Sequence, residues 1–316
     1  MSNPQIKFKK AKRLKCKASI LIEGLSGTGK SGLALAIARV LSPSWDKVFA
    51  TDTENNSLPL YSGLTLFTGE KITDFNVGDL TEDLGYSPSN YLAFRDLAIQ
   101  EGAEAIVQDS ISHAWQYKGG ILDLVTQAQT NKKYNNYTAW GDEKVVAEKN
   151  KLLSLIRDSR IHVISTVRIK EKMEIVEGAD GKKKIESIGE QQIMQGDIKY
   201  EPDLVLRMVS PGTADKAPVV TVIKSRYAPF VKDETYTMNM TMLLQLKRYL
   251  EDGADPEELK EEQRLEYVKA VKEFLDAKPN FLPIWQKIKK DAGLEDTKLD
   301  DIGLEEIKQL YIKISD

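Results

Sequence analysis

The sequence is poor in the side chains that build disulfides and metal centres. Among its 316 residues there are one cysteine, Cys16, and two histidines, His113 and His162. A single cysteine excludes an internal disulfide and favours a reducing compartment. So few soft ligands argue against a zinc site of the usual types. His162 falls in an apolar run, where a structural role is the simpler interpretation.

Long apolar runs and a net basic charge are also missing. No segment has the roughly 20 consecutive apolar residues that a membrane-spanning helix needs, and the N-terminus does not resemble a signal peptide. We therefore expect a cytoplasmic protein without membrane contact. The formal net charge is −3, so any contact with nucleic acid requires a local basic patch. Residues 1–17 form one such patch. They are either a DNA-binding or subunit-contacting arm or a solvated leader.

What the sequence does contain is a phosphate-binding loop. Residues 24–31, GLSGTGKS, match the pattern G-x-x-x-x-G-K-[ST] at every fixed position. The apolar run 18–23 predicts a strand before the loop, and 32–41 predicts a helix after it. Backbone N–H groups in such a loop cradle phosphate oxygens, and the helix N-terminus adds a positive dipole. The motif therefore predicts a site for ATP and Mg²⁺.

Each position of the loop has an expected role. Lys30 would reach the β- and γ-phosphates, and the hydroxyl of Ser31 would hold Mg²⁺. The residues expected to contact the nucleotide are Gly24, Ser26, Gly27, Thr28, Gly29, Lys30, Ser31 and Gly32.

Two acidic residues follow predicted strands farther along the chain. The strand predicted at 103–108 leads into Asp109, which is typical of a Walker B carboxylate that holds Mg²⁺ beside Ser31; a helix-capping Asp is the alternative. The strand predicted at 48–51 leads into Glu54. Ligands bind at the carboxyl ends of strands in such sheets, so Glu54 is a candidate for activating the attacking water. The alternative is an exposed polar loop.

The remaining pattern predicts an α/β core and a helical C-terminal part. We expect further strands at 64–67, 161–167, 204–209 and 218–224. We expect helices at 88–100, capped by Ser87 and ended by Gly102, at 142–160 and at 241–250. Composition changes at 251, and the rest reads as short helices with Pro283 and Gly293 between them. The predicted domains are an arm (1–17), an ATPase core (18–250) and a helical domain (251–316).

Two segments between these elements are candidates for binding nucleic acid. Residues 112–141 are polar and aromatic, and the tyrosines and lysines of 131–137 either stack bases and neutralise phosphates or form a solvated surface. Trp115 and Trp140 fit core packing better. Residues 168–199 predict a long loop or hairpin with Asp180-Gly181 at its apex. The segment carries Arg168, Lys170, Lys172 and the lysine run 182–184, and insertions of this length are functional or disordered.

From residue 18 to 250 the order of these parts resembles the RecA-like P-loop ATPases. More narrowly, it resembles the phage-encoded members that assist single-strand annealing and recombination. Four pieces carry the resemblance: the P-loop, the Asp-Thr-Glu that ends in Glu54, the Walker B segment 107–110, and VIKSRYAPF at 222–230. The fold that this implies is a RecA-like P-loop NTPase core with a mostly parallel central sheet, followed by a small all-helical C-terminal domain.

The resemblance also implies how the protein works. Lys224 and Arg226 would reach the ATP of a neighbouring subunit in a homo-oligomer, either a ring or a filament, although an exposed strand face explains them too. Residues 112–141 and 169–198 would be the loops that bind single-stranded DNA. The protein would act in the bacterial host cell, alongside a phage single-strand-binding or replication protein. Thr166 falls where the family has a γ-phosphate-sensing glutamine, and a threonine cannot span the same distance.

Three functions therefore compete at this stage. The first is a DNA-stimulated ATPase that promotes annealing or homologous recombination. The second is a helicase loader or motor subunit whose substrate is another protein, which the helical C-terminal part would suit. The third is a nucleotide or small-molecule kinase, which would need a lid such as 169–198.

Overall fold

A computed structural model describes most of the chain, and within it there are two compact units. The described residues are 11–54, 56–130, 134–177, 183–194, 196, 198–209 and 215–315. One unit spans Cys16–Leu250, and the other combines Met1–Lys15 with Glu251–Asp316. Some sequence-based predictions lie outside the described residues: the first ten residues of the arm, Lys132 and Lys133, the hairpin apex at 178–181, and the turn at 210–213.

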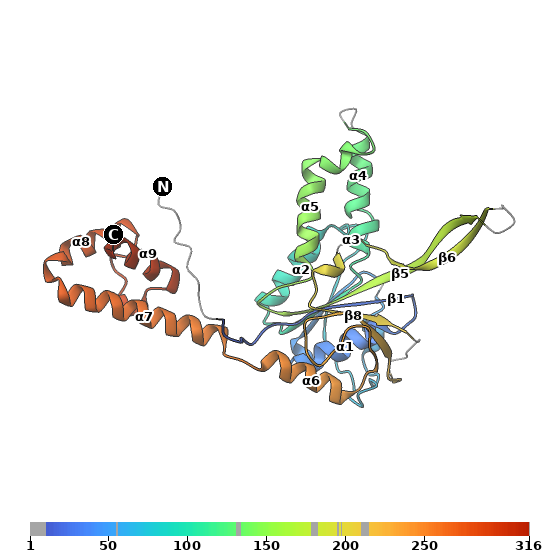
Figure 1. Ribbon diagram of the computed structural model, residues 1–316, viewed down its shortest axis with the longest axis horizontal. Helices are drawn as coiled ribbons and strands as arrows, with labels where there is room; N and C mark the ends of the chain where they lie inside the picture. Colours follow the sequence, from blue (N-terminus) through green and yellow to red (C-terminus); the bar gives the residue numbers. More distant parts are fainter. Residues whose placement is uncertain are drawn as a thin grey trace. The chain divides into compact units, whose positions relative to one another are not determined.

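The larger unit is built on a mostly parallel sheet, as predicted (Figure 1). Its strands are β1 (Ser19–Gly24), β2 (Val48–Asp52), β3 (Asn76–Asp79), β4 (Ala105–Asp109), β5 (His162–Glu177), β7 (Leu204–Met208), β8 (Val219–Ser225) and β9 (Thr235–Thr237). They lie in the order β3-β2-β4-β5-β1-β7-β8-β9. Pairing is parallel from β3 to β7, and β8 and β9 add antiparallel strands at one side. The carboxyl ends of β1, β2, β4 and β5 therefore share one edge.

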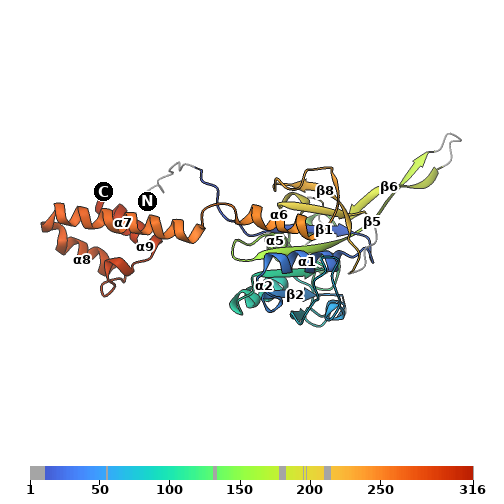
Figure 2. The ribbon, with the colours of Figure 1, turned by 90° about the horizontal axis from the view of Figure 1, so that it is seen from below.

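Helices cover both faces of this sheet because its central strands are apolar on both faces. In β1, Ile20 and Ile22 pack in one core with α1 (Lys30–Leu41) and α6 (Met240–Glu251). Leu21, which points the other way, packs in a second core with α2 (Pro88–Gln100), α4 (Ile121–Gln129) and α5 (Glu143–Ser154). Figure 2, turned by 90°, shows α1 and α6 on the near face.

Several helix boundaries follow the predicted signals. The Ser87 hydroxyl accepts a hydrogen bond from Asn90 N at 3.2 Å, and Pro88 occupies the first helical position of α2. Gly102, with φ +82°, follows the end of the helix. Asp142 caps α5 by accepting from the N–H groups of Lys144 and Val145. These capped ends fix the two helices on the α2 side of the sheet.

The strand predicted at 64–67 is wrong, and a strand that we did not predict takes its place. Residues 64–72 form a turn with one isolated bridge, Thr65 to Lys71, and Leu66 is buried there as a loop anchor. The edge strand β3 contains Asn76, Gly78 and Asp79, which are types depleted in strands. A Cβ on Gly78 would lie 2.4 Å from the Phe94 ring, so glycine lets α2 pack closely there.

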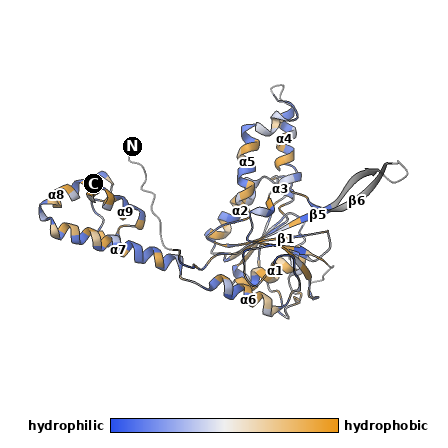
Figure 3. Cartoon of the chain, viewed as in Figure 1, coloured by the Kyte–Doolittle hydropathy of each residue, from blue (hydrophilic) through white to orange (hydrophobic). Residues whose placement is uncertain are grey.

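The segment after β4 contains helices that the sequence did not predict. It contains α3 (His113–Gln116) and α4, and α4 pairs with α5 as a helical hairpin that stands out from the sheet (Figure 1). In Figure 3 both helices carry hydrophobic and hydrophilic residues, as amphipathic helices do. The rings of Trp115 and Trp140 lie 6.0 Å apart near this hairpin. Helix α5 ends at Ser154, six residues before the predicted end.

The predicted hairpin at 168–199 is a direct extension of the core sheet. Strand β5 is continuous over 16 residues, from its place between β4 and β1 into pairing with β6 (Lys183–Gln192). Both Figure 1 and Figure 2 show this two-stranded arm leaving the sheet. Because one strand serves both the core and the arm, the foot of the arm lies directly at the edge where β1, β2 and β4 end.

The second unit is helical in its described part. Its helices are α7 (Pro256–Ala277), α8 (Leu282–Asp291) and α9 (Leu304–Ser315), and Asp255 caps α7. They enclose a core of Val268, Val271, Trp285, Ile302, Ile307, Leu310 and Ile314. Residues 11–15 also belong to this unit, since Leu14 bridges to Ala254 and Lys15 N donates to the Ala254 carbonyl at 3.0 Å. Among the described helices, each is too short or too polar to cross a membrane.

His162 has a structural position at the start of β5. Its Nδ1 accepts a hydrogen bond from the backbone N–H of Ala18 at 2.9 Å, which requires an unprotonated nitrogen. Burial, and then the positive charges of Lys17 and Lys247, lower the pKa of His162 to about 3. The unfolded chain takes up this proton near pH 6.5, whereas the folded chain does not. Folding is therefore stabilised above pH 6.5, and that stability is lost as the pH falls toward 3.

Replacing His162 with asparagine should make the protein less sensitive to acid. The asparagine side chain retains an acceptor for Ala18 N but does not titrate. Between about pH 7 and pH 5, His162 should account for about 2 kcal/mol of lost unfolding free energy in the native protein. We expect urea unfolding to show that the loss of unfolding free energy between these two pH values is smaller by about 2 kcal/mol in His162→Asn than in the native protein. Equal pH dependence in both proteins would contradict this role.

Candidate nucleotide site

The P-loop joins β1 to α1 at the carboxyl edge of the sheet. Gly27 and Gly29 have φ of +75° and +84°, values that glycine adopts without strain. A Cβ on Gly24 would lie 2.8 Å from Thr28 Oγ1 and 2.9 Å from Met208 Cβ, so the first glycine is needed for close packing. Glycine is therefore needed at both fixed glycine positions of the motif, at Gly24 for close packing and at Gly29 for its backbone conformation.

Lys30 is the buried cation of this loop. Its side chain is largely covered, and Nζ donates to the carbonyl of Leu25 within the same loop at 2.8 Å. Burial lowers the pKa of Lys30, while the nearby charges of Asp109 and Glu54 oppose that shift. A triphosphate in the loop would replace the Leu25 carbonyl as the partner of Nζ with a stronger, charged acceptor.

Asp109 lies opposite the loop, at the end of β4, and both of its carboxylate oxygens accept hydrogen bonds. The Ser31 hydroxyl donates to Oδ2, and the Thr166 hydroxyl donates to Oδ1 from β5. Burial raises the pKa of Asp109, and these two hydrogen bonds oppose the shift. Ser31 and Asp109, 78 residues apart, are therefore adjacent, as the sequence predicted. Thr166 contacts this carboxylate directly, so it does not need the reach of a glutamine to touch the site.

The loop after β2 places Glu54 beside this cluster. Asp52 accepts from the backbone N–H of Glu54 at 2.7 Å and from that of Leu58 at 2.8 Å. Thr53 N donates to the Asp109 carbonyl at 2.9 Å. These bonds fix the backbone on both sides of Glu54. Its carboxylate accepts from Arg168, with Nε and Nη2 of the guanidinium 2.9 Å and 2.8 Å from Oε1.

These residues fit ATP and Mg²⁺. Mg²⁺ is usually held by one or two carboxylates together with substrate phosphates and water. Asp109 and the Ser31 hydroxyl supply that kind of donor set beside the loop. The buried ammonium of Lys30 and the glycine-shaped backbone supply the complement to phosphate oxygens. When bound, the metal would neutralise charge on the phosphates, and Lys30 and the loop N–H groups would orient them.

Comparison with known proteins agrees with this geometry. A family model described as an AAA domain (AAA_24) matches residues 16–238, more than half of the chain. The chain belongs to this AAA-domain family. It is a P-loop ATPase by family, in agreement with the coarser part of the sequence-based resemblance. A search of curated proteins found no match.

Lys224 and Arg226 of this AAA-domain protein lie far from its own P-loop. Strand β8 is antiparallel to β7, with Ser225 opposite Leu204, and Leu204 is opposite Ile20 at the start of β1. The P-loop follows the other end of β1, about 13 Å farther along the strand at 3.3 Å per residue. The two side chains are therefore at the opposite edge of the sheet.

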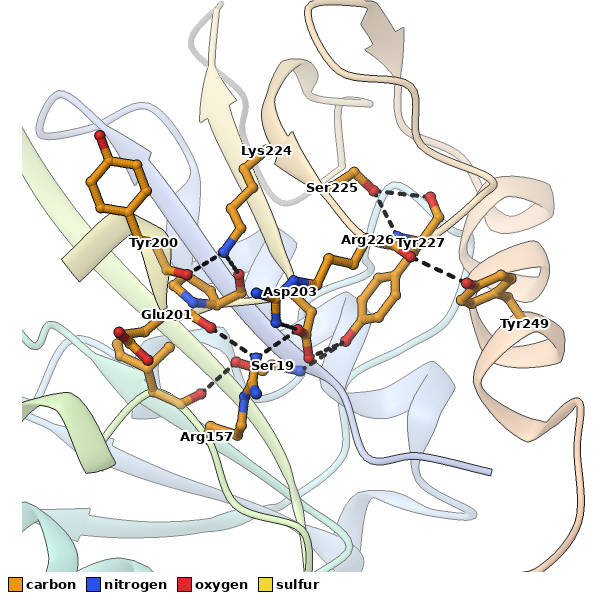
Figure 4. Close-up of polar contacts among 12 residues, drawn as sticks. Ser19, Arg157, Tyr200, Glu201, Asp203, Lys224, Ser225, Arg226, Tyr227 and Tyr249 are labelled. Carbon is orange, nitrogen blue, oxygen red and sulfur yellow. Dashed lines mark hydrogen bonds and ion pairs between the residues drawn. The ribbon is translucent and has the colours of Figure 1, made fainter. Parts of the chain in front are cut away.

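Both cations contact the segment before β7 (Figure 4). Lys224 Nζ donates to the carbonyls of Tyr200 and Pro202, and the Arg226 guanidinium lies 2.9 Å from Asp203, which also pairs with Arg157. Burial, with Arg226 nearby, lowers the pKa of Lys224. Arg226 follows the last residue of β8 and is 57% exposed. Its guanidinium can therefore leave Asp203 without any change in the sheet.

Sequence reasoning missed two residues beside Glu54. Arg168 falls in the predicted loop or hairpin at 168–199, where nothing in the sequence distinguishes it from the neighbouring lysines. His113 is 4% exposed, and its ring nitrogens make no hydrogen bond of ordinary geometry with the described residues. Burial, and then the charge of Arg168, lower the pKa of His113 to about 4, so the ring is neutral near pH 7. The local sequence does not indicate that Arg168 and His113 lie beside Glu54, because only the folded sheet brings these residues together.

Proposed function

We propose that this protein is an ATPase that acts on single-stranded DNA and completes its ATP site between protomers. The observation that supports this most is the division of the site between two edges of one sheet. The P-loop, Asp109 and Glu54 lie at one edge, whereas Lys224 and Arg226 lie at the other. Cations so placed can stabilise charge developing on the γ-phosphate of a neighbouring molecule.

In this proposal each group has one task. Lys30 and the loop N–H groups hold the phosphates, and Ser31 and Asp109 hold Mg²⁺. Glu54 orients and deprotonates the attacking water. The β5–β6 arm and the aromatic segment around α3 and α4 bind the DNA, and annealing or homologous recombination is the process served. The family membership supports the nucleotide chemistry, and the DNA substrate is our inference from the arm and the sequence resemblance.

The test is the rate of ATP hydrolysis with and without poly(dT), measured over a range of protein concentrations. We expect DNA to raise the rate, and we expect the rate per molecule to rise with protein concentration because the site needs a neighbour. A rate per molecule that stays constant on dilution would contradict the shared site. ATP hydrolysis that DNA leaves unchanged would instead favour the alternative in which another protein is the substrate.

A further inference from the structure

Glu54, the candidate base, is held by a neighbouring cation. Two guanidinium nitrogens of Arg168 lie within 2.9 Å of one carboxylate oxygen, and both side chains are more than two-thirds buried. Charge-assisted hydrogen bonds of this kind are short and strong. A carboxylate oxygen offers about two lone-pair sites, and Arg168 occupies those of Oε1, so this oxygen cannot also accept from a water molecule. In this arrangement Glu54 is therefore restrained.

The restraining residue lies at the foot of the arm. Arg168 N donates to the Ser112 hydroxyl at 2.9 Å, and its carbonyl accepts from Ile193 N at 2.8 Å. In β5 it comes two residues after Thr166, which contacts Asp109. The other strand of the arm ends at Gln192, whose amide donates to Glu23, the residue before Gly24. Both strands of the arm thus contact residues next to the nucleotide site.

A cavity of about 400 Å³ opens beside the ion pair. Glu54 and Arg168 line it, together with Lys118 and the three rings of Tyr86, His113 and Tyr117. The His113 ring lies 4.3 Å from that of Tyr117 and 5.3 Å from that of Tyr86, between centroids. Glu82 is a further acidic residue in the lining. Lys118 and Arg168 together provide two cations around a space with an aromatic wall.

We propose that Arg168 is a positioning residue that restrains Glu54 until a phosphate group of single-stranded DNA enters this cavity and takes over the guanidinium. The proposal rests on the proposed function and names the contact through which DNA would stimulate hydrolysis. A phosphodiester offers the guanidinium the same two-oxygen geometry as a carboxylate. Lys118 would contribute a second charge, and the exposed ring of Tyr117 would stack on an adjacent base. Freed from Arg168, Oε1 of Glu54 can accept a hydrogen bond from the attacking water.

The decisive variant is Arg168→Gln, assayed without DNA. We expect its turnover to rise about 10- to 100-fold, the range that corresponds to losing one charge-assisted hydrogen bond, with the KM for ATP unchanged. The turnover of Arg168→Gln should be about the same with and without poly(dT). Arg168→Lys retains the positive charge but not the two-nitrogen contact of the guanidinium, so it should keep part of the stimulation by poly(dT). A variant that is merely damaged would lose turnover instead.

Two further variants tie the effect to these residues. In the double variant Glu54→Gln/Arg168→Gln, the rate increase seen in Arg168→Gln should disappear, because the Glu54 carboxylate is absent. Lys118→Gln should raise the poly(dT) concentration needed for half-maximal stimulation, whereas the exposed Lys232→Gln should not. Inorganic phosphate at the same phosphate concentration should stimulate little, because it lacks the neighbouring bases and charges of a polymer.

Each contrary outcome overturns a specific part. If Arg168→Gln turns over ATP no faster than the native protein without DNA, Arg168 does not restrain Glu54. If the double variant keeps the raised rate, Glu54 is not the group released. If poly(dT) changes neither the native rate nor its protein-concentration dependence, the proposed DNA substrate is wrong, and with it the trigger. The DNA-free rate of Arg168→Gln decides the restraint independently of that result.

Discussion

Replacing Lys224 or Arg226 with alanine should lower ATP turnover by about 10³-fold or more and leave ATP affinity nearly unchanged. A cation supplied by a neighbour is typically worth about 10³ to 10⁵ in rate, because it stabilises charge that develops only in the transition state. In the folded molecule neither side chain approaches its own P-loop. Binding of ATP to a single protomer therefore does not depend on them. Turnover measured beside equilibrium ATP binding separates the two effects.

Mixing experiments make this prediction sharper. Arg226→Ala retains an intact P-loop, and Lys30→Ala retains Lys224 and Arg226. A mixture of the two should recover activity, because each supplies what the other lacks. Lys232, an exposed lysine of the same unit that pairs with Asp233, provides the matched control, and Lys232→Ala should behave as the native protein. Absence of rescue, with both variants folded, would rule out a site shared between molecules.

Glu54→Gln should lower the rate of hydrolysis by about 10²- to 10⁴-fold, the usual contribution of a general base. The substitution preserves the shape of the side chain, and an amide oxygen can still accept from Arg168. The backbone bonds from Asp52 and Thr53 do not involve the side chain, so the loop should keep its place. ATP binding should remain, and single-turnover measurement should show that the loss is in the chemical step.

Asp52→Asn is an informative comparison for Glu54. Its carboxylate organises the loop, with one oxygen accepting from Glu54 N and the other from Leu58 N. An asparagine can accept one of these hydrogen bonds well and the other poorly. We expect a partial loss of rate, smaller than that of Glu54→Gln. A larger loss in Asp52→Asn than in Glu54→Gln would contradict the role of Glu54 as the base.

Much of this fold follows from local sequence signals. The P-loop predicts its flanking strand and helix. The side chains of the wholly buried β1 point alternately to the two faces of the sheet, which explains the two cores. These predictions succeed because motif, strand and helix all lie within one short segment and support one another.

What the sequence could not provide depends on contacts across the sheet. Arg168 and Glu54 are 114 residues apart, and only the order β2-β4-β5 brings them together. Strand β3 was missed because Gly78 is there for the close approach of Phe94, which no propensity expresses. The apolar residues of 64–67 resemble a strand but anchor a turn. The continuity of β5 into the arm was also hidden, since the sequence pattern changes at its foot.

The placement of Lys224 and Arg226 across the sheet from the P-loop has a consequence for how activity scales with assembly size. If the two cations serve the next molecule, every protomer is directional, with a donor end and an acceptor end. An open chain of n protomers then contains n − 1 finished catalytic centres, and one terminal nucleotide always lacks its cations. A closed ring contains n. Specific activity that keeps climbing with length would identify an open chain, and activity that reaches a plateau at a fixed stoichiometry would identify a ring.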